Sequence, residues 1–213
     1  MSQDQASAPA PSNLIYVAGN IAAGKSTFCR LLQQALGASL VEENVGRNPY
    51  LDRFYTDMAR WSFHVDVHFL TLRGGAVRRE FRPGGAPAVF DRCYLEGSVF
   101  AAVAYATGQV SAEERATFEL LLETFDSLLP PPGVLVYLSA EPPALLRRVA
   151  DRGRPYEHGM SLDYLRALQE EYERWFETYE RSPKIRVETG PADLRSDLTT
   201  ARSIADEIAA YVR

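Results

Sequence analysis

Short apolar runs alternate with amphipathic stretches along most of this chain. Apolar runs bounded by turn residues predict buried strands at 13–18, 39–41, 88–91, 134–138 and 184–188. Between them, apolar positions recur at helical spacing and predict helices over 26–36, 58–80, 94–107, 112–128, 142–151, 161–181 and 194–212. Strands that alternate with helices indicate βαβ units, so the expected fold class is α/β, with a five-stranded parallel sheet flanked by helices on both faces.

Turn-forming residues end or interrupt the predicted elements, but none of them marks a boundary between domains. Gly74 and Gly75 lie inside the helix expected at 58–80, where they predict a kink. No internal repeat and no linker separates one part of the sequence from another. We therefore expect a single domain over 13–213, preceded by a disordered tail over 1–12.

Composition narrows the classes of function. The 213 residues carry a formal net charge of −5, which argues against a nucleic-acid partner held by bulk positive charge. No apolar run reaches the roughly 18 residues that a membrane helix needs, so no membrane partner is expected. Residues 1–12 lack the basic start and apolar stretch of a signal peptide, and Cys29 and Cys93 are the two cysteines. Together these features predict a cytoplasmic protein without a disulfide framework.

A phosphate-binding loop follows the first strand. The sequence from Gly19 to Ser26 matches the pattern G-x-x-x-x-G-K-[ST], between a predicted strand and a predicted helix. The residues expected to surround ATP phosphates are Gly19, Asn20, Ile21, Ala22, Ala23, Gly24, Lys25, Ser26 and Thr27. Backbone N–H groups and the positive end of the helix hold phosphate there, while Lys25 reaches the outer phosphates and Ser26 suits Mg²⁺. A glycine-rich turn without a ligand is the alternative.

Acidic and basic residues end the next two strands. Asp91 and Arg92 follow the third strand, where the acid suits the Mg²⁺ shell and the arginine suits a phosphate; a structural ion pair is the alternative. Glu42 and Glu43 follow the second strand and point to opposite sides, so only one faces the ligand crevice. That carboxylate would take a proton from an attacking hydroxyl, unless the pair is a solvated acidic loop.

Four arginines surround Gly153 near the end of the predicted helix at 142–151. They are Arg147, Arg148, Arg152 and Arg154. A glycine among clustered guanidinium groups is typical of a mobile basic lid that closes over a transferring phosphate and offsets its charge. A solvated charged helix end is the alternative.

A polar pair lies on the long helix at 58–80. Asp66 and Arg73 are seven residues apart and so share a helix face, which Phe63, Phe69 and Leu70 border. A carboxylate and an arginine beside aromatic side chains suit the polar edge of a flat ring. An internal salt bridge between Asp66 and Arg73 is the alternative.

These blocks together resemble the deoxynucleoside kinase family, in particular its bacterial deoxyadenosine/deoxyguanosine kinase branch. The resemblance covers residues 13–190 and rests on GNIAAGKST at 19–27, NPYLDRFYTDMARWSFH at 48–64, DR at 91–92 and RVADRGRPYE at 148–157. It implies a three-layer P-loop kinase fold with an arginine-rich lid at about 148–160. It also implies transfer of the ATP γ-phosphoryl group to the 5′-hydroxyl of a deoxynucleoside in nucleotide salvage, with Mg²⁺.

The resemblance assigns roles to matching positions. Glu43 falls on the family's general base, Arg92 on the arginine near the 5′-hydroxyl, and Asp91 on the acidic neighbour of that arginine. Tyr55 and Glu157 fall on the pair that binds the sugar 3′-hydroxyl. The lid arginines, which would contact ATP, are Arg148, Arg152 and Arg154. Asn44 replaces the proline and Cys93 the Ser or Thr that the family usually has.

Departures from the family gather where the base should bind. Asp66 replaces a glutamine, whereas Arg73 matches. The stretch after Arg92 is one residue shorter, so the family's base-reading aspartate falls on Glu96 or on Gly97. An ionised aspartate only accepts hydrogen bonds. Asp66 therefore predicts a preference for deoxyguanosine, which offers ring N–H and amino donors, over deoxyadenosine.

Two other functions are compatible with the motifs. A nucleoside monophosphate kinase resembling thymidylate kinase also combines a P-loop with an Asp-Arg block, but it needs more positive charge for the acceptor phosphate. A non-catalytic regulatory subunit of a heteromeric kinase would bind ATP and transfer nothing alone. The family resemblance implies a homodimer, or a heterodimer, formed through the helices at 58–80 and 112–128.

Overall fold

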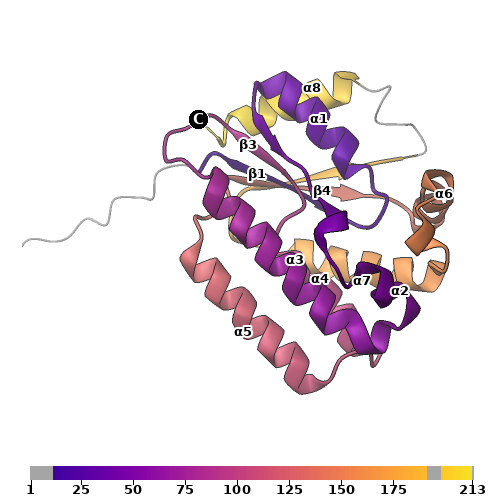
Figure 1. Cartoon of the computed structure of the whole chain (residues 1–213). Coiled ribbons are helices and arrows are strands. Elements are labelled where there is room, and N and C mark those ends of the chain that lie inside the picture. Colours follow the sequence, from indigo (N-terminus) through magenta and orange to yellow (C-terminus); the bar gives the residue numbers. More distant parts are fainter. Residues whose placement is uncertain (1–11, 191–197, 213) are drawn as a thin grey trace, which may run out of the picture.

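A five-stranded parallel sheet runs through the middle of the molecule (Figure 1). The computed structural model describes residues 12–190 and 198–212. The strands lie in the order β2-β3-β1-β4-β5. Their bounds are β1 Leu14–Gly19, β2 Ser39–Val41, β3 Ala88–Asp91, β4 Val134–Ser139 and β5 Lys184–Glu188. The five expected strands and their parallel direction are confirmed.

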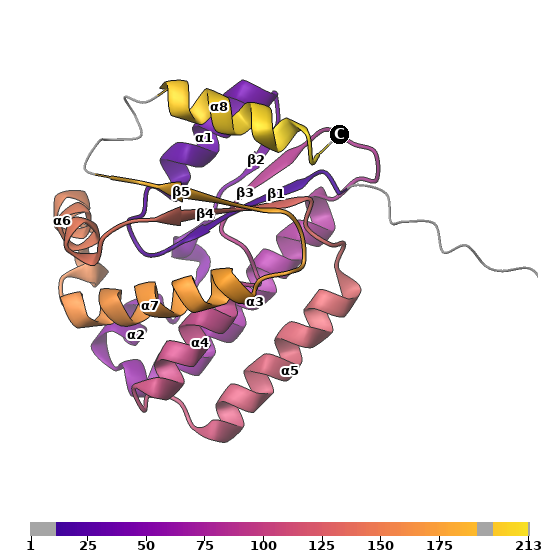
Figure 2. The ribbon, with the colours of Figure 1, turned by 180° about the vertical axis from the view of Figure 1, so that it is seen from behind.

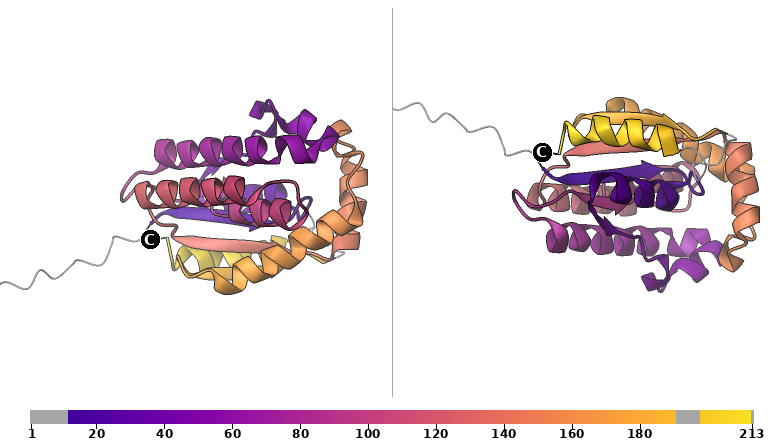
Figure 3. Two further views of the ribbon diagram at one scale, coloured as in Figure 1. Left: turned by 90° about the horizontal axis from the view of Figure 1, so that it is seen from below. Right: turned by 90° about the horizontal axis from the view of Figure 1, so that it is seen from above.

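Helices cover both faces of the sheet and make three layers (Figures 1 and 2). The helices are α1 Lys25–Leu36, α2 Leu51–Thr56, α3 Met58–Glu80, α4 Gly97–Ala106, α5 Ala112–Leu128, α6 Pro142–Arg152, α7 Leu162–Thr178 and α8 Leu198–Ala209. α1 and α8 pack together on one face, and α3, α4, α5 and α7 lie on the other. Figure 3 shows α6 at one end of the layers, across the ends of the strands.

The central strands form the core because they are buried on both faces. All six residues of β1 and the first five of β4 are buried, which explains why these strands are continuous apolar runs. Tyr16 in β1 meets Phe90 of β3 and Tyr94 edge to face, with centroids 5.3 and 6.0 Å apart. The rigid sheet therefore fixes the positions of the loops that follow its strands.

The hydrophobic periodicity of the sequence did not predict the short helices. The six-residue helix α2 and the single turns at Val45–Arg47 and Pro155–Glu157 are shorter than the window from which a helical period can be read. α4 starts at Gly97 rather than 94. The predicted tail at 1–12 falls outside the described residues except for Ser12, as does the start of the closing helix expected at 194–212. None of the described helices is long and apolar enough to cross a bilayer.

α3 continues unbroken through the two glycines where a kink was expected. A Cβ atom at Gly74 would lie 2.4 Å from Cδ1 of Phe125 in α5, whereas one at Gly75 would meet nothing closer than the tip of Arg79, at 3.4 Å. Gly74 therefore allows α3 and α5 to approach, and Gly75 has no such role.

This difference predicts opposite effects of two neighbouring substitutions. Gly74→Ala should lower the free energy of unfolding by about 1–3 kcal/mol, because the added methyl group overpacks the contact with Phe125. Gly75→Ala should raise it by up to about 1 kcal/mol through helix propensity. Urea unfolding of both variants tests this, and equal changes in the two would contradict the assigned role of Gly74.

Candidate active site

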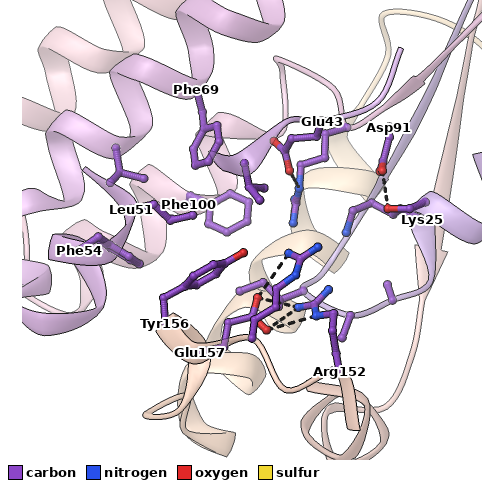
Figure 4. A pocket seen from close by; sticks show the side chains of 18 of the residues that line it. Lys25, Glu43, Leu51, Phe54, Phe69, Asp91, Phe100, Arg152, Tyr156 and Glu157 are labelled. Carbon is purple, nitrogen blue, oxygen red and sulfur yellow. Dashed lines mark hydrogen bonds and ion pairs between the residues drawn. The ribbon is translucent and has the colours of Figure 1, made fainter. Parts of the chain in front are cut away.

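A cavity of about 800 Å³ opens beside the carboxyl ends of β1, β2 and β3. Because β1 pairs with β3 and β3 with β2, the loops after these strands meet at one edge of the sheet, as expected. Figure 4 shows Lys25, Glu43 and Asp91 on one side of the cavity, with Arg152 and Glu157 facing them. Apolar side chains, among them Leu51, Phe54, Phe69 and Phe100, line the remaining wall.

The loop after β1 has the backbone that its glycines predict. Gly19 has φ 146°, and a Cβ atom there would lie 2.5 Å from the Leu138 carbonyl oxygen, so glycine is needed. Gly24, at φ 96°, starts α1. The residues of this loop that line the cavity are Ile21, Ala22, Ala23, Gly24, Lys25, Ser26 and Thr27. The loop thus presents its turn and the helix start to the cavity.

Gly19 and Asn20 do not line the cavity. The Asn20 amide turns toward α7, where Nδ2 donates to the Leu165 carbonyl at 2.9 Å and to Gln169 at 3.2 Å. Its Oδ1 accepts a hydrogen bond from Ile21 N. The side chain of Asn20 therefore anchors the loop to α7, and the expected contact of the Asn20 backbone with ATP stays a prediction.

Lys25 lies across the mouth of the loop. Its Nζ donates to the carbonyl oxygens of Gly19 and Asn20, both at 2.7 Å. Burial, and next the positive charge of Arg92, lower the pKa of Lys25 to about 7. A phosphate beside Nζ would raise this pKa again, because a neighbouring anion favours the charged form.

Ser26 and Asp91 offer two adjacent oxygen ligands. Ser26 Oγ donates to Asp91 Oδ2 at 2.5 Å. Burial raises the pKa of Asp91, against the opposing effect of Lys25. Mg²⁺ is held by one or two protein oxygens together with phosphates and waters rather than by a protein cage. The pair fits this chemistry, and within residues 12–190 and 198–212 no cluster of three or more His, Cys, Asp or Glu forms a competing site.

Glu43 is the acid that faces the cavity. Its Oε1 accepts hydrogen bonds from Arg73 Nε at 3.0 Å and Nη2 at 2.5 Å, and its Oε2 pairs with Arg92 Nε at 2.8 Å. Burial alone would raise the pKa of Glu43, but Arg73 and Arg92 outweigh it and lower the pKa below its usual value. Glu42 points outward to Arg30, and both side chains are more than half exposed.

Arg73 therefore pairs with Glu43 across the cavity wall. The alternative of a salt bridge between Arg73 and Asp66 does not appear among the ion pairs of the described residues.

Glu96 acts beneath the site and not in it. Its side chain is fully buried, and Oε2 accepts from Gly19 N at 3.2 Å and from the Tyr172 hydroxyl at 2.7 Å. Its Oε1 pairs with Arg92 Nη1 at 3.1 Å. Of the two positions considered for base reading, Glu96 is thus engaged elsewhere and Gly97 lines the cavity.

Gly97 cannot simply carry a side chain. A Cβ atom there would lie 3.0 Å from Cζ of Phe118 in α5, and Phe118 is buried. The carboxylate at this end of the cavity comes instead from Asp66 on the opposite helix.

One stripe of α3 forms the far end of the cavity. The stripe consists of Ser62, Val65, Asp66, Phe69 and Arg73. Burial raises the pKa of Asp66 to about 7, and Arg73 only partly offsets this. Phe63 is absent from the cavity lining and packs against the core. At 3.6 residues per turn it lies about 60° beyond Asp66 around the helix, so its side chain is directed away from the cavity face on which the base contact was expected.

The lid residues form ion pairs at the near end. Arg152 holds the Glu157 carboxylate through Nη2 at 2.7 and 2.8 Å, and Nε lies 3.2 Å from Oε2. Arg154 lies 3.7 Å from the same carboxylate. The Tyr156 ring stacks on Tyr55, with centroids 5.7 Å apart, which brings Tyr55 and Glu157 to the same wall.

Arg148 is also tied to the protein. It donates to Thr189 Oγ1 and to the carbonyl oxygens of Thr189 and Gly190 at 2.7–3.2 Å. All three arginines line the cavity.

Several lining residues carried no signal in the sequence analysis. Ser62, Gln109 and Tyr164 line the cavity, and Tyr172 supports Glu96 from α7. Each is a single polar residue on an otherwise ordinary helix face or loop, so only the packing of α3, α4 and α7 against one another brings them to the site.

Comparisons with known proteins agree with this geometry. The family model described as deoxynucleoside kinase matches residues 15–213. A deoxyadenosine/deoxycytidine kinase of Bacillus subtilis is 32% identical over 203 residues, covering 94% of each chain. A deoxyguanosine kinase of the same organism is 30% identical, covering 93% of this chain and 95% of the relative. The fold is similar to that of a deoxyadenosine kinase from M. mycoides with bound dCTP, at TM-score 0.77 and 24% identity, covering 92% of this chain and 99% of the other.

The half-buried carboxyl group of Asp66 on the cavity wall predicts a pH-dependent stability. Its pKa is about 7 in the folded chain and ordinarily 3.8, so the unfolded state gives up the proton first and ionisation destabilises the fold as pH rises from about 4 to about 7. Asp66→Asn should therefore raise the melting temperature at pH 8 more than at pH 5. Substitution of the exposed Asp52 by Asn is the control. An equal rise in the melting temperature of Asp66→Asn at both pH values would contradict the raised pKa of Asp66.

Proposed function

The chain belongs to the deoxynucleoside kinase family, and we propose that it transfers the ATP γ-phosphoryl group to the 5′-hydroxyl of a purine deoxynucleoside, with Mg²⁺, in cytoplasmic nucleotide salvage. The observation that carries the proposal is the position of Glu43. Its carboxylate lies between the phosphate loop and the apolar end of the cavity, with both oxygens oriented by arginines. A nucleoside bound against α3 would present its 5′-hydroxyl there.

Glu43 would act as an acceptor that is always ionised. Because Arg73 and Arg92 lower its pKa despite burial, it is a weak base and does not remove a proton in advance. Phosphoryl transfer passes through a loose transition state, in which positioning and charge stabilisation matter most. Glu43 orients the hydroxyl and takes its proton as the new P–O bond forms and the bond from the γ-phosphorus to the bridging oxygen of ADP breaks.

The positive groups around Glu43 would stabilise the phosphoryl group in transfer. Lys25 lies at the loop, Arg92 lies beside Glu43, and Arg152 and Arg154 reach the cavity from the lid. Mg²⁺ held by Ser26 and Asp91 supplies further charge neutralisation when bound. Tyr55 and Glu157 suit the neutral 3′-hydroxyl of a sugar better than a second phosphate, which argues against a monophosphate acceptor.

The names of the relatives include adenine, cytosine and guanine nucleosides, so the base must be inferred from this chain's own residues. We place the base between α3 and α4, where Asp66 and Phe100 line the cavity. An ionised Asp66 accepts hydrogen bonds from the N1–H and 2-amino groups of guanine, whereas adenine sets a lone pair against it. Deoxyguanosine is therefore the proposed preferred substrate.

A homodimer through α3 and α5 is part of the proposal. On α5, the side chains of Leu120 and Leu128 are 64% and 77% exposed. Apolar side chains of this size are usually buried, and a second copy of the chain would cover them.

A turnover panel with ATP and Mg²⁺ tests the activity. The four deoxynucleosides are assayed beside their monophosphates. We expect a purine deoxynucleoside to be turned over fastest and the monophosphates to be inert. Glu43→Gln should lower kcat at least about 100-fold, because general-base catalysis is worth that much. The adjacent Glu42→Gln, which is exposed, should leave kcat nearly unchanged. Near-normal turnover by Glu43→Gln would remove it as the base.

Asp66 should set the ratio of deoxyguanosine to deoxyadenosine turnover. An opposed polar edge costs about 1–3 kcal/mol, which is roughly tenfold or more in kcat/KM, so Asp66→Gln should lower the ratio by about that factor. An unchanged ratio would show that Asp66 does not read the base.

The same ratio should depend on pH in the wild type. With a pKa of about 7, Asp66 ionises as pH rises from 6 to 8, so the ratio should increase, whereas it should stay flat in Asp66→Gln. Arg73 and Tyr164 are the charged and titratable groups that act on it. Lys25 also has a pKa near 7, but it acts on the phosphates of both reactions and cancels in the ratio.

A further inference from the structure

Gln109 reaches the base end of the cavity from the loop after α4. Gly108 adopts φ 72° there, and the Gln109 N–H donates to the Ala104 carbonyl at 2.8 Å. The chain therefore turns back over the last turn of α4. This turn brings the half-buried Gln109 side chain to the cavity wall, next to Ser62 of α3.

The Ser62 hydroxyl contacts the Gln109 amide. The buried Ser62 hydroxyl donates to Gln109 Oε1 at 3.0 Å. An amide has an acceptor and a donor on opposite sides, so Nε2 is the remaining polar atom. No group in the described parts of the chain accepts a hydrogen bond from Nε2, which leaves a donor available to a ligand.

This donor lies beside the acceptor that the proposed function assigns to the base. Ser62 and Asp66 are four residues apart on α3, so their Cβ atoms lie about 5–6 Å from each other. The Gln109 amide at Ser62 and the Asp66 carboxylate together therefore present a donor and an acceptor along one wall of the cavity.

The order of these groups is the complement of a 6-oxopurine. Such a base presents a carbonyl oxygen at position 6 next to N–H at position 1, and guanine adds a 2-amino donor. Adenine presents a donor at position 6 and an acceptor at position 1. The Ser62 hydroxyl can also donate to the Met58 carbonyl oxygen, at 2.7 Å. When the Ser62 proton points to Met58, the Gln109 amide can rotate so that Nε2 and Oε1 exchange places. The selection at position 6 is therefore graded rather than absolute.

We propose that Gln109 is a second base-reading residue, whose Nε2 donates to O6 of a 6-oxopurine deoxynucleoside while its Oε1 accepts from the Ser62 hydroxyl. The inference rests on the proposed function, which places the base against α3, and adds a residue that acts on position 6 alone. Asp66 instead accepts hydrogen bonds from N1–H and from the 2-amino group of the base.

The test is a thermodynamic cycle that combines a substitution at Gln109 with a change of one atom in the base, and compares kcat/KM across the four combinations. Deoxyguanosine is compared with 2′-deoxy-6-thioguanosine, which keeps the N1–H and 2-amino groups but replaces O6 with a weakly accepting sulfur. The wild type is compared with Gln109→Met, which keeps a similar side-chain volume without the amide. Thr107→Ala, exposed in the same loop, is the control for disturbance of the loop.

The wild type and Thr107→Ala should prefer deoxyguanosine about fivefold or more in kcat/KM, the effect of one neutral hydrogen bond. In Gln109→Met the preference should fall below about twofold, and in Ser62→Ala it should be intermediate because the amide loses its anchor. The same preference in Gln109→Met as in the wild type would overturn the proposal.

Equilibrium dissociation constants of the two nucleosides, measured without ATP, separate this inference from the proposed function. If no phosphoryl transfer occurs but the binding preference depends on Gln109, the base-reading role stands and the transfer reaction fails. If neither nucleoside binds the wild type, both proposals fail.

Discussion

The site depends on a buried guanidinium group between two carboxylates. Arg92 pairs with Glu43 at 2.8 Å and with Glu96 at 3.1 Å, and all three side chains are at most slightly exposed. A buried charge is tolerated only when it is paired. Removing Arg92 would leave Glu96 without its cationic partner and Glu43 with Arg73 alone. Glu96 also accepts from Gly19 N, which links Glu43, through Arg92, to the start of the loop after β1.

The backbone at Arg92 is held in an uncommon conformation by this arrangement. Its φ is 91°, in the region that favours glycine. The Arg92 N–H donates to Val17 O in the neighbouring strand at 3.1 Å, so the sheet fixes the residue where it leaves β3. Three cations, Lys25, Arg73 and Arg92, then face three carboxylates, Glu43, Asp91 and Glu96. Under the proposed function, a triphosphate would add negative charge to a cavity whose cations already face carboxylates, and Mg²⁺ and the arginines of the predicted lid would offset it.

The sheet and the phosphate loop could be predicted because each has a local signal. Buried parallel strands are continuous apolar runs, and the turn at Gly19 needs glycine whatever the rest of the chain does. Strand alternation alone could not choose between Glu42 and Glu43, since the choice depends on Arg73 and Arg92, which arrive from other elements; the family resemblance chose Glu43. The side-chain neighbours of Asn20, Phe63 and Glu96 could not be predicted for the same reason, because tertiary packing sets their contacts with α7, with the core side of α3 and beneath the loop.

The crowding behind Gly97 has a consequence for how this pocket can change over time. Phe118 Cζ lies 3.0 Å from where a Cβ atom at Gly97 would be, so any side chain at Gly97 requires the Phe118 ring to shift by a few tenths of an ångström. Substitutions at Gly97 and Phe118 are therefore coupled, because a smaller residue at position 118 would leave room for a side chain at position 97.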